Sequence, residues 1–553
     1  MPAVLGLSAA DAAAAAALAL ASHFIFARIE LWPARLFPAW AALYSGSVLL
    51  VRHTRAPLAL SAALGLVARG AVVYVATLLL SIGVYRVLFH RCCAFPGPTS
   101  CALSKWATVP VDAAGQRARY VQRLHSQYGD IVRTGPRELS INDPSVIAAT
   151  CGAQSKCSKG PWYAGATAGK GRRSRSLHTT TIKADHAARR RIWDGGFNAR
   201  SLRSYEPSLL ALSRLLVERM GESAARGEKV EVDEWAAYYG FDVMGQVGFS
   251  SSFECVENGK LSEGVQLLQD AMAAIQTLSN VPYLGEIARY LPSPIVKLED
   301  WVAGSLRRRM DDPSAGPDVF KHLLEVDQES GWKHNWEELR SDAMLQVVAG
   351  SDTASTTLAV SFYYLLTHDK AMEALRKELH HVFKGAEPDN FDALAKECRF
   401  LNAVINESLR LWPPVASGLQ RVTPAEGLTL SVAGKQLVVP GDVIVTTPTF
   451  LMQRDPRNFA PHPEAFRPER WLAPEHEENF NLKAFNPFSY GPESCIGRHL
   501  AFMEIRIAVA QVVHAYDMEL LPEFSAEAFE AGIVDFFTAG RKKKLPIKLT
   551  PRR

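Results

Sequence analysis

The loop from Phe488 to Gly497 places a single cysteine, Cys495, directly before an apolar stretch with helical spacing. A thiol at a helix N-terminus meets free backbone N–H groups and the positive end of the helix dipole, which favour the thiolate. Gly491 and Gly497 let the backbone pass close to a large, flat group. A thiolate held in this way suits a soft metal such as the iron of haem. For the cysteine taken alone, a buried structural thiol remains the preferred interpretation.

Two further segments carry charges at spacings that allow pairing. Glu407 and Arg410 stand three residues apart in the predicted helix 399–411, so both side chains lie on one face of it. The segment from Phe466 to Trp471 supplies another arginine, Arg470. One Glu–Arg pair by itself usually indicates a surface salt bridge of small value.

An acid and an alcohol, Asp352 and Thr353, follow Gly350 inside the long predicted helix 336–366. One interpretation is a hydroxyl that bonds back to the preceding helical turn. The other is a polar notch that delivers protons to a buried reaction centre.

Together and in this order, these segments resemble the cytochrome P-450 family of haem-thiolate monooxygenases. The resemblance extends from about Phe95 to the C-terminus and includes the Pro96-Gly97-Pro98 turn. It implies a mainly α fold with small β-sheets, preceded here by N-terminal transmembrane helices. Helical periodicity over 201–220, 233–247, 262–278 and 336–366, with a hairpin over 131–142, agrees with that fold.

The resemblance also implies roles for particular residues. Cys495 would be the axial ligand of the iron of haem b, and Asp352 and Thr353 would help to protonate bound dioxygen. Glu407, Arg410 and Arg470 would form the structural charge cluster. Further expected haem contacts are Arg190 to a propionate, His186, Phe488, Gly491, Gly497 and Arg498. Expected pocket residues are Val348, Ala349, Val415, Ala416, Ser417, Phe536 and Phe537.

One position departs from the family pattern. Members usually have an arginine two residues before the cysteine, in contact with a propionate, and Glu493 stands there instead. Because two carboxylates repel each other, either Glu493 turns to solvent or a nearby cation compensates. The candidates for that cation are His186, Arg190 and Arg498.

The first 90 residues form uncharged apolar runs over 12–27, 36–51 and 56–85, the last interrupted by Arg69. We expect one to three membrane helices, with three favoured, and a cleaved signal peptide fits poorly because no basic segment precedes the first run. Basic residues in both loops, 28–35 and 52–55, leave the orientation open. The expected organisation is a membrane anchor over 1–91, a proline-containing hinge over 92–110 and a haem-binding catalytic domain over 111–553.

Composition sets wider limits. The chain has 553 residues, a net charge of +4 that residues 1–90 supply in full, and 48% hydrophobic residues. A neutral body argues against nucleic acid as a partner. Eight cysteines without a CxxC pair indicate a reducing compartment and no structural zinc site.

The expected activity is insertion of one oxygen atom from dioxygen into a hydrophobic substrate. The chain has no dinucleotide fingerprint, so electrons would come from a partner. The resemblance implies NADPH and NADPH–cytochrome P-450 reductase as that source, with cytochrome b5 as a second donor. The long anchor resembles that of fungal members, particularly from basidiomycetes, which oxidise terpenoids, other specialised metabolites or xenobiotics. We expect the endoplasmic reticulum membrane, with the catalytic domain in the cytosol. Two alternatives stay open: a haem-thiolate isomerase or dehydratase that does not use dioxygen, and a non-enzymatic membrane haem protein.

Overall fold

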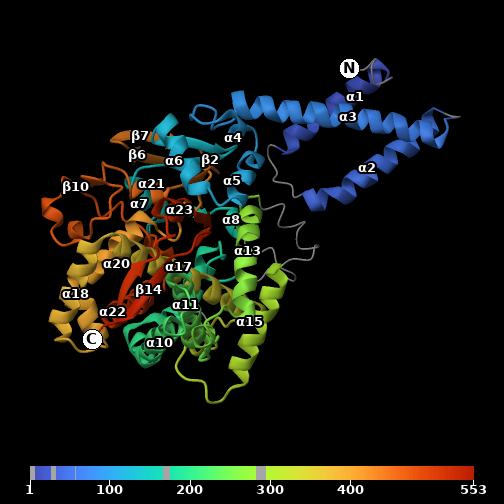
Figure 1. Cartoon of the computed structure of the whole chain (residues 1–553). Coiled ribbons are helices and arrows are strands. Elements are labelled where there is room, and N and C mark those ends of the chain that lie inside the picture. The colour runs from blue at the N-terminus through green and yellow to red at the C-terminus, as the bar shows by residue number, and fades with distance from the viewer. Residues whose placement is uncertain are drawn as a thin grey trace.

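The computed structural model describes residues 7–26, 33–55, 58–165, 175–281, 294–329 and 331–552. A helical body carries small sheets, and three N-terminal helices project from it (Figure 1). The mainly α fold with small sheets that the sequence predicts is therefore confirmed.

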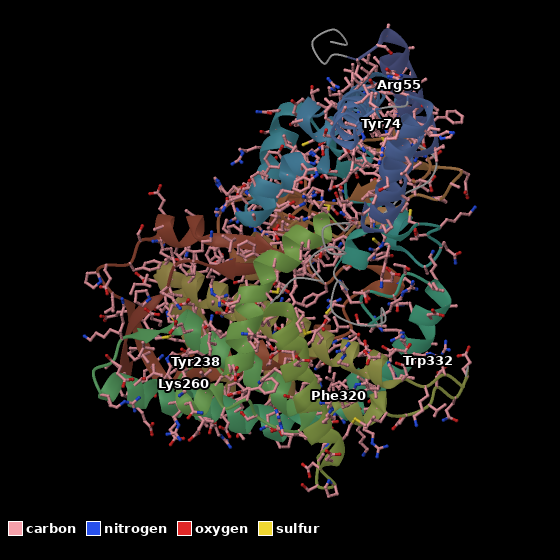
Figure 2. All side chains as sticks on the ribbon, turned by 90° about the vertical axis from the view of Figure 1, so that its right-hand side faces the viewer. Arg55, Tyr74, Tyr238, Lys260, Phe320 and Trp332 are labelled. Atoms are coloured by element: carbon pink, nitrogen blue, oxygen red, sulfur yellow. The ribbon has the colours of Figure 1, made fainter. Side chains whose placement is uncertain are left out.

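The N-terminal helices are α1 (Ala9–Phe26), α2 (Pro33–Thr54) and α3 (Leu60–Val84), and α3 continues as one π-helical turn, η1 (Tyr85–Phe89). Of the described helices, α1 and the continuous segment Leu60–Phe89 are long and apolar enough to cross a membrane. Large apolar side chains such as Leu18, Leu80 and Phe89 are exposed on them. Figure 2 shows Arg55 and Tyr74 on this projecting part, away from Tyr238 and Phe320 in the body. Most of the first basic loop lies outside the described residues.

Two polar contacts set the direction of α1 against its neighbours. Near the start of α1, Asp11 pairs with Arg55, just beyond the end of α2, at 2.5 Å. Near the end of α1, the Nδ1 atom of His23 lies 2.6 Å from the Oγ atom of Ser81, near the end of α3. Helices α1 and α3 therefore run in the same direction. Helix α2, which lies between them in the chain, runs in the opposite direction.

The body contains most of the helices. They are α4 (Thr99–Leu103), α5 (Val109–Ala113), α6 (Arg117–Tyr128), α7 (Ser145–Cys151), α8 (Trp162–Gly165), α9 (Lys183–Phe197), α10 (Ala199–Ala225), α11 (Val232–Phe249), α12 (Cys255–Asn258), α13 (Glu263–Asn280), α15 (Pro294–Asp311), α16 (Val319–Leu323), α17 (Trp336–Thr367), α18 (Asp369–Phe383), α19 (Phe391–Lys396), α20 (Arg399–Leu411), α21 (Thr449–Met452), α22 (Arg498–Ala515) and α23 (Ala526–Ala531).

The longest helix, α17, runs through the centre of the body (Figure 1). It begins with a capping box in which Asn335 and Glu338 each bond the other's backbone N–H, and these bonds satisfy free donors of the first turn. It packs along α11 with a very close approach, because an added Cβ at Gly350 would lie 2.0 Å from the sulfur of Met244. The glycine that weakens this helix locally is therefore also what brings α11 against it.

The strands within the described residues form five small sheets. The largest has the order β1 (Ile131–Gly135), β2 (Glu138–Ile141), β8 (Ile444–Thr446), β5 (Arg421–Val422) and β3 (Ser158–Lys159). A second has the order β11 (Tyr516–Leu520), β14 (Pro546–Pro551) and β4 (Val230–Glu231). The remaining pairs are β6 (Leu428–Val432) with β7 (Lys435–Val439), β9 (Phe459–Ala460) with β10 (Asn479–Phe480), and β12 (Ile533–Phe536) with β13 (Thr538–Arg541).

Candidate functional site

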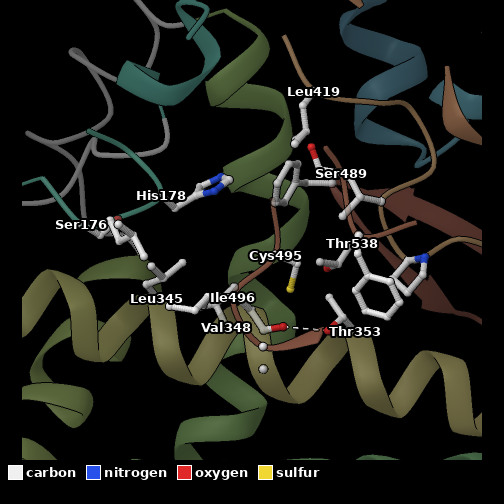
Figure 3. A pocket seen from close by; sticks show the side chains of 18 of the residues that line it. Ser176, His178, Leu345, Val348, Thr353, Leu419, Ser489, Cys495, Ile496 and Thr538 are labelled. Carbon is white, nitrogen blue, oxygen red and sulfur yellow. Dashed lines mark hydrogen bonds between the residues drawn. The ribbon is translucent and has the colours of Figure 1, made fainter. Parts of the chain in front are cut away.

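Thr353 of α17 faces a cavity of about 410 Å³ in the middle of the body. Its hydroxyl donates to the carbonyl oxygen of Ala349, one turn earlier, at 2.8 Å (Figure 3). Both interpretations of this position thus describe one geometry: the hydroxyl bonds back to the helix and also lines the cavity. A hydroxyl that rotates can exchange this bond for one to a group inside the cavity.

Asp352 points in a different direction and does not line that cavity. Its carboxylate accepts a hydrogen bond from the hydroxyl of Thr538 in β13, and burial raises its pKa. Thr538 does line the cavity, so Asp352 reaches the cavity through that hydroxyl. The predicted pair, Asp352 and Thr353, therefore lies on one helix, but only Thr353 lines the cavity, and Asp352 pairs with Thr538 of β13 instead.

Cys495 lies in the cavity wall opposite α17, with its sulfur directed into the space (Figure 3). Its backbone N–H donates to the carbonyl oxygen of Phe488 at 2.8 Å and closes the loop. Gly491 has a φ of +77°, and an added Cβ there would lie 2.0 Å from the carbonyl oxygen of Cys151. The loop can follow this path only with glycine at that position.

The sulfur stands at the start of α22, as the sequence predicts. Backbone N–H groups of Gly497 and Arg498 and the charge of Arg190 lower the pKa of the Cys495 thiol, but burial outweighs them and the net direction is upward. The backbone N–H groups at the start of α22 thus act toward the thiolate, in the direction that the sequence predicts. A bound metal cation deprotonates such a thiol on ligation.

The charge cluster lies behind the cavity and is completely buried. Glu407 accepts two hydrogen bonds of 2.8 Å from Arg410 and one of 3.1 Å from Arg470. Its Oε2 atom also accepts from the indole N–H of Trp471 at 2.9 Å. These donors lower the pKa of Glu407 despite its burial. None of the three charged residues lines the cavity.

Arg410 connects this cluster to the segments that precede the cysteine loop. Its guanidinium donates to the carbonyl oxygens of Gln453, Pro463 and Ala465. The side chain of Gln453 in turn accepts from the backbone N–H of Asn486, two residues before Phe488. The cluster thus fixes the base of the loop that presents the thiol.

Three cations form one edge of the cavity: Lys159, Arg190 and Arg421. Lys159 and Arg421 are directly opposite each other in the β3–β5 ladder. Like charges in such a pair are destabilising unless an anion joins them. Glu493 supplies that anion, with Arg421 at 2.9 Å and Lys159 at 4.0 Å.

The cations that the sequence suggested as partners of Glu493 were wrong. Burial lowers the pKa of His186 to about 4, so this side chain is neutral at pH 7. Arg190 instead donates to the carbonyl oxygen of Ser494 at 2.7 Å, and Arg498 lies over the ring of Phe488. Lys159 and Arg421 were missed because only the pairing of β3 with β5 brings them together.

The predicted pocket residues divide into two groups. Val348, Ala349, Val415 and Phe537 line the cavity. Ala416, Ser417 and Phe536 do not, and these three assignments were wrong. Ser417 turns away to donate to Asp535 of β12 and lines a much smaller neighbouring cavity. Phe536 ends strand β12, where side chains alternate between faces, and the sequence did not show which face is the inner one. Of the expected haem contacts, His186, Arg190, Phe488 and Gly497 line the cavity, whereas Gly491 and Arg498 do not.

Sequence reasoning also missed a buried acid, Glu504 of α22, which lines the cavity. Its Oε2 atom has no hydrogen-bond partner among the residues that the structure describes, and burial raises its pKa well above the ordinary value. Burial therefore favours the protonated form of Glu504, which can donate a hydrogen bond. Cys495 precedes α22, and nine residues are about two and a half helical turns, so spacing from the cysteine does not predict this position.

These features fit a haem group. The thiol of Cys495 projects from the wall, the cations along one edge match the charge of two propionates, and the remaining lining is largely apolar.

Comparison with known proteins agrees with this geometry. The family model described as cytochrome P-450 matches residues 96–544. Cytochrome P-450 monooxygenase FCK2 of Fusarium pseudograminearum is 36% identical over 469 residues, which cover 83% of this chain and 82% of that protein. Tryprostatin B 6-hydroxylase of Aspergillus fumigatus is 32% identical, with 87% and 84% covered. Trichothecene C-15 hydroxylase of Fusarium sporotrichioides is 30% identical, with 86% and 96% covered.

The chain therefore belongs to the cytochrome P-450 family, and its relatives are fungal monooxygenases. The family resemblance drawn from the cysteine loop, the ExxR pair and the long helix is confirmed. The narrower resemblance to basidiomycete members stays a prediction.

Proposed function

We propose that this protein is a membrane-bound haem b monooxygenase that inserts one oxygen atom from dioxygen into a hydrophobic specialised metabolite. The observation that carries the proposal is the placement of Cys495 and Thr353 on opposite walls of one cavity (Figure 3). Haem, when bound there, supplies the iron that binds and activates dioxygen. The protein residues supply the ligand, the protons and the shape of the cavity.

Each wall has a distinct task in this proposal. Cys495 ligates the iron, while Arg190, Lys159 and Arg421 hold the propionates. Thr353 holds a proton at Oγ1, where it can be passed into the cavity. The Asp352–Thr538 pair and Glu504, whose protonated form burial favours, are two further buried groups through which this proton can be resupplied.

The substrate class follows from the lining and from the relatives. Val348, Ala349, Leu345 and Phe537 give the cavity an apolar surface above the thiol. The named relatives hydroxylate tryprostatin B and a trichothecene. We infer a fungal specialised metabolite for this chain, with terpenoids among the candidates.

Electrons must come from outside, since the sequence has no dinucleotide-binding fingerprint. We propose NADPH–cytochrome P-450 reductase as the donor, with cytochrome b5 as a second one. The apolar helices α1 and α3 support an anchor, which we assign to the endoplasmic reticulum with the body in the cytosol. A substrate that partitions into lipid would then be concentrated near the enzyme.

The proposal is tested in yeast microsomes that contain the chain and a fungal reductase. The microsomes receive NADPH, heavy-isotope dioxygen and a panel of sesquiterpenes, triterpenes and indole-containing metabolites. We expect a product that carries one labelled oxygen atom and depends on NADPH. A product without label, formed equally well without NADPH, would contradict the proposal.

The alternative of an isomerase or dehydratase makes a different prediction for Thr353. If the hydroxyl delivers a proton to bound dioxygen, Thr353→Ala should lower product formed per NADPH consumed by about tenfold or more. Without dioxygen chemistry, the same change should leave turnover nearly unaltered. The polar lining at Thr353, Thr538 and Glu504 favours the monooxygenase.

A further inference from the structure

The cavity wall contains an ion pair far from the thiol. Glu299 of α15 and Arg340 of α17 both line the cavity, next to Ile295 and Met344. Arg340 lies 13 residues before Thr353 on α17, so at 1.5 Å per residue the pair stands roughly 20 Å along the helix from the proposed oxygen site. Arg340 lies roughly 12 Å from Val348 along the helix axis, by the same rise of 1.5 Å per residue.

The two charges of this pair are not in direct contact. The guanidinium of Arg340 donates to Glu337 at 2.7 Å, whereas the nearest carboxylate oxygen of Glu299 is 4.0 Å away, beyond hydrogen-bond distance. Two carboxylates thus share one guanidinium, which leaves a net negative charge. In the part of the chain that the structure describes, the side-chain carboxylate of Glu299 accepts no hydrogen bond.

Glu299 is also held in an unfavourable environment. Its side chain is only 19% exposed, and burial raises its pKa, with Asp300 and Glu337 acting in the same direction and Arg340 against them. A partly desolvated carboxylate gains most from a cationic partner that donates to it or lies against it. Neither Glu337 nor Asp300 lines the cavity, so a ligand inside the cavity meets Glu299 and the edge of Arg340.

We propose that Glu299 is a specificity-determining residue that binds a positively charged nitrogen of the substrate. The substrate would be an apolar skeleton with a basic amine, placed so that a carbon at the opposite end lies between Thr353 and Cys495. This inference rests on the proposed monooxygenase function and narrows its substrate class to alkaloid-like amines. Arg340 stays with Glu337, and the substrate ammonium takes the free side of Glu299.

The test uses ligands that differ only in charge. The probes are ω-phenylalkyl trimethylammonium ions of graded chain length, each paired with a neutral isostere in which tert-butyl replaces trimethylammonium. A quaternary nitrogen has no lone pair and cannot ligate iron, so it cannot bind in the reverse orientation through the metal. Binding to the ferric holoprotein is measured from the spin-state shift of the haem spectrum.

In the wild-type holoprotein we expect the cation to bind at least about tenfold more tightly than its isostere at the best chain length. Glu299→Gln should abolish this preference. Asp300 is the next residue in α15, carries the same charge and is exposed. Asp300→Asn is therefore the matched control, and it should leave the preference unchanged. Arg340→Gln should strengthen cation binding, because it removes the competing positive charge.

Equal binding of cation and isostere to the wild-type protein would overturn the inference, as would equal effects of Glu299→Gln and Asp300→Asn. Tighter binding of the neutral probe in the presence of a normal thiolate-type CO spectrum would overturn this inference alone. Loss of that spectrum from the wild-type holoprotein would overturn the proposed function, and the inference with it.

Discussion

Glu407 illustrates how a single carboxylate organises the site without touching the cavity. It pairs with both Arg410 and Arg470, and all three side chains are completely buried. A second carboxylate, Glu477, also pairs with Arg470. Removing one partner of a buried ion pair leaves an uncompensated charge, which costs about 3–5 kcal/mol. We predict that Glu407→Gln lowers the free energy of unfolding by about that amount and strongly reduces the yield of holoprotein.

Denaturant unfolding, followed together with haem absorbance, measures both effects. The matched control is Glu373→Gln, which removes a carboxylate from the exposed pair with Lys377 on α18. That change should shift the unfolding free energy by less than about 0.5 kcal/mol. Similar effects of the two substitutions would contradict the structural role of the cluster.

At the residue scale, the sequence predicts partners that lie within one helix and misses partners that depend on the topology. Glu407 and Arg410 share a helical face, so their spacing alone predicts the pair. Glu493 pairs with Lys159 and Arg421, which are more than 250 residues apart from each other in the chain. No local sequence pattern predicts that β3 pairs with β5.

At the scale of elements, the cysteine loop depends on one backbone conformation. Gly491 has a positive φ and also lies against the backbone of Cys151. We predict that Gly491→Ala displaces the loop and removes the thiolate-type CO spectrum of the reduced protein. The control is Gly227→Ala, since Gly227 has a similar φ of +73° but open space around its Cα. That variant should keep the spectrum and lose only about 1 kcal/mol of stability. Retention of the spectrum in both variants would refute the steric argument.

A second prediction at the scale of elements concerns the β12–β13 hairpin. Burial raises the pKa of Asp535 from 3.8 to about 6, while Ser417 and the backbone N–H of Phe537 donate to it and Arg117 lowers it. Between these two values the folded protein binds the proton more tightly than the unfolded chain. Stability should therefore fall as the pH rises from 3.8 to about 6, by at most about 3 kcal/mol.

The measurement compares thermal unfolding of the wild type and Asp535→Asn across that pH range. Asparagine does not titrate, so the difference in Tm between the two proteins should change with pH and level off above pH 6. Parallel Tm curves would show that Asp535 does not carry the predicted shift.

The sequence predicts elements better than their pairing. The segment 437–445 reads as two strands joined by a Pro-Gly turn, and strands β7 and β8 do lie there. They nevertheless join different sheets, β7 with β6 and β8 with β2 and β5. Turn chemistry indicates where a chain reverses, but burial of each strand's face decides which neighbour it takes.

At the scale of the whole molecule, the N-terminal helices bear on membrane topology. Because α1 and α3 run in the same direction and α3 leads into the body, the start of α1 lies at the end away from the body. If α1, α2 and α3 all cross the membrane, the N-terminus and the body lie on opposite sides. We predict that protease added to intact microsomes digests the body but spares a tag at the N-terminus. Digestion of both would contradict three spans.

The sequence already predicts the apolar runs, but its basic loops do not decide the orientation. The structure adds the pairs Asp11–Arg55 and His23–Ser81, which join helices far apart in the chain. Such contacts depend on how the helices pack, and hydropathy carries no information about packing.

The most direct test of the central claim is the CO difference spectrum of the reduced protein with Cys495→Ser. The account predicts complete loss of the thiolate-type spectrum, because serine offers no thiolate to the iron. Cys151→Ser is the matched control, since Cys151 lines the same cavity, and it should leave the spectrum intact. A thiolate-type spectrum that survives Cys495→Ser, or that disappears with Cys151→Ser, would contradict the assignment of Cys495 as the ligand.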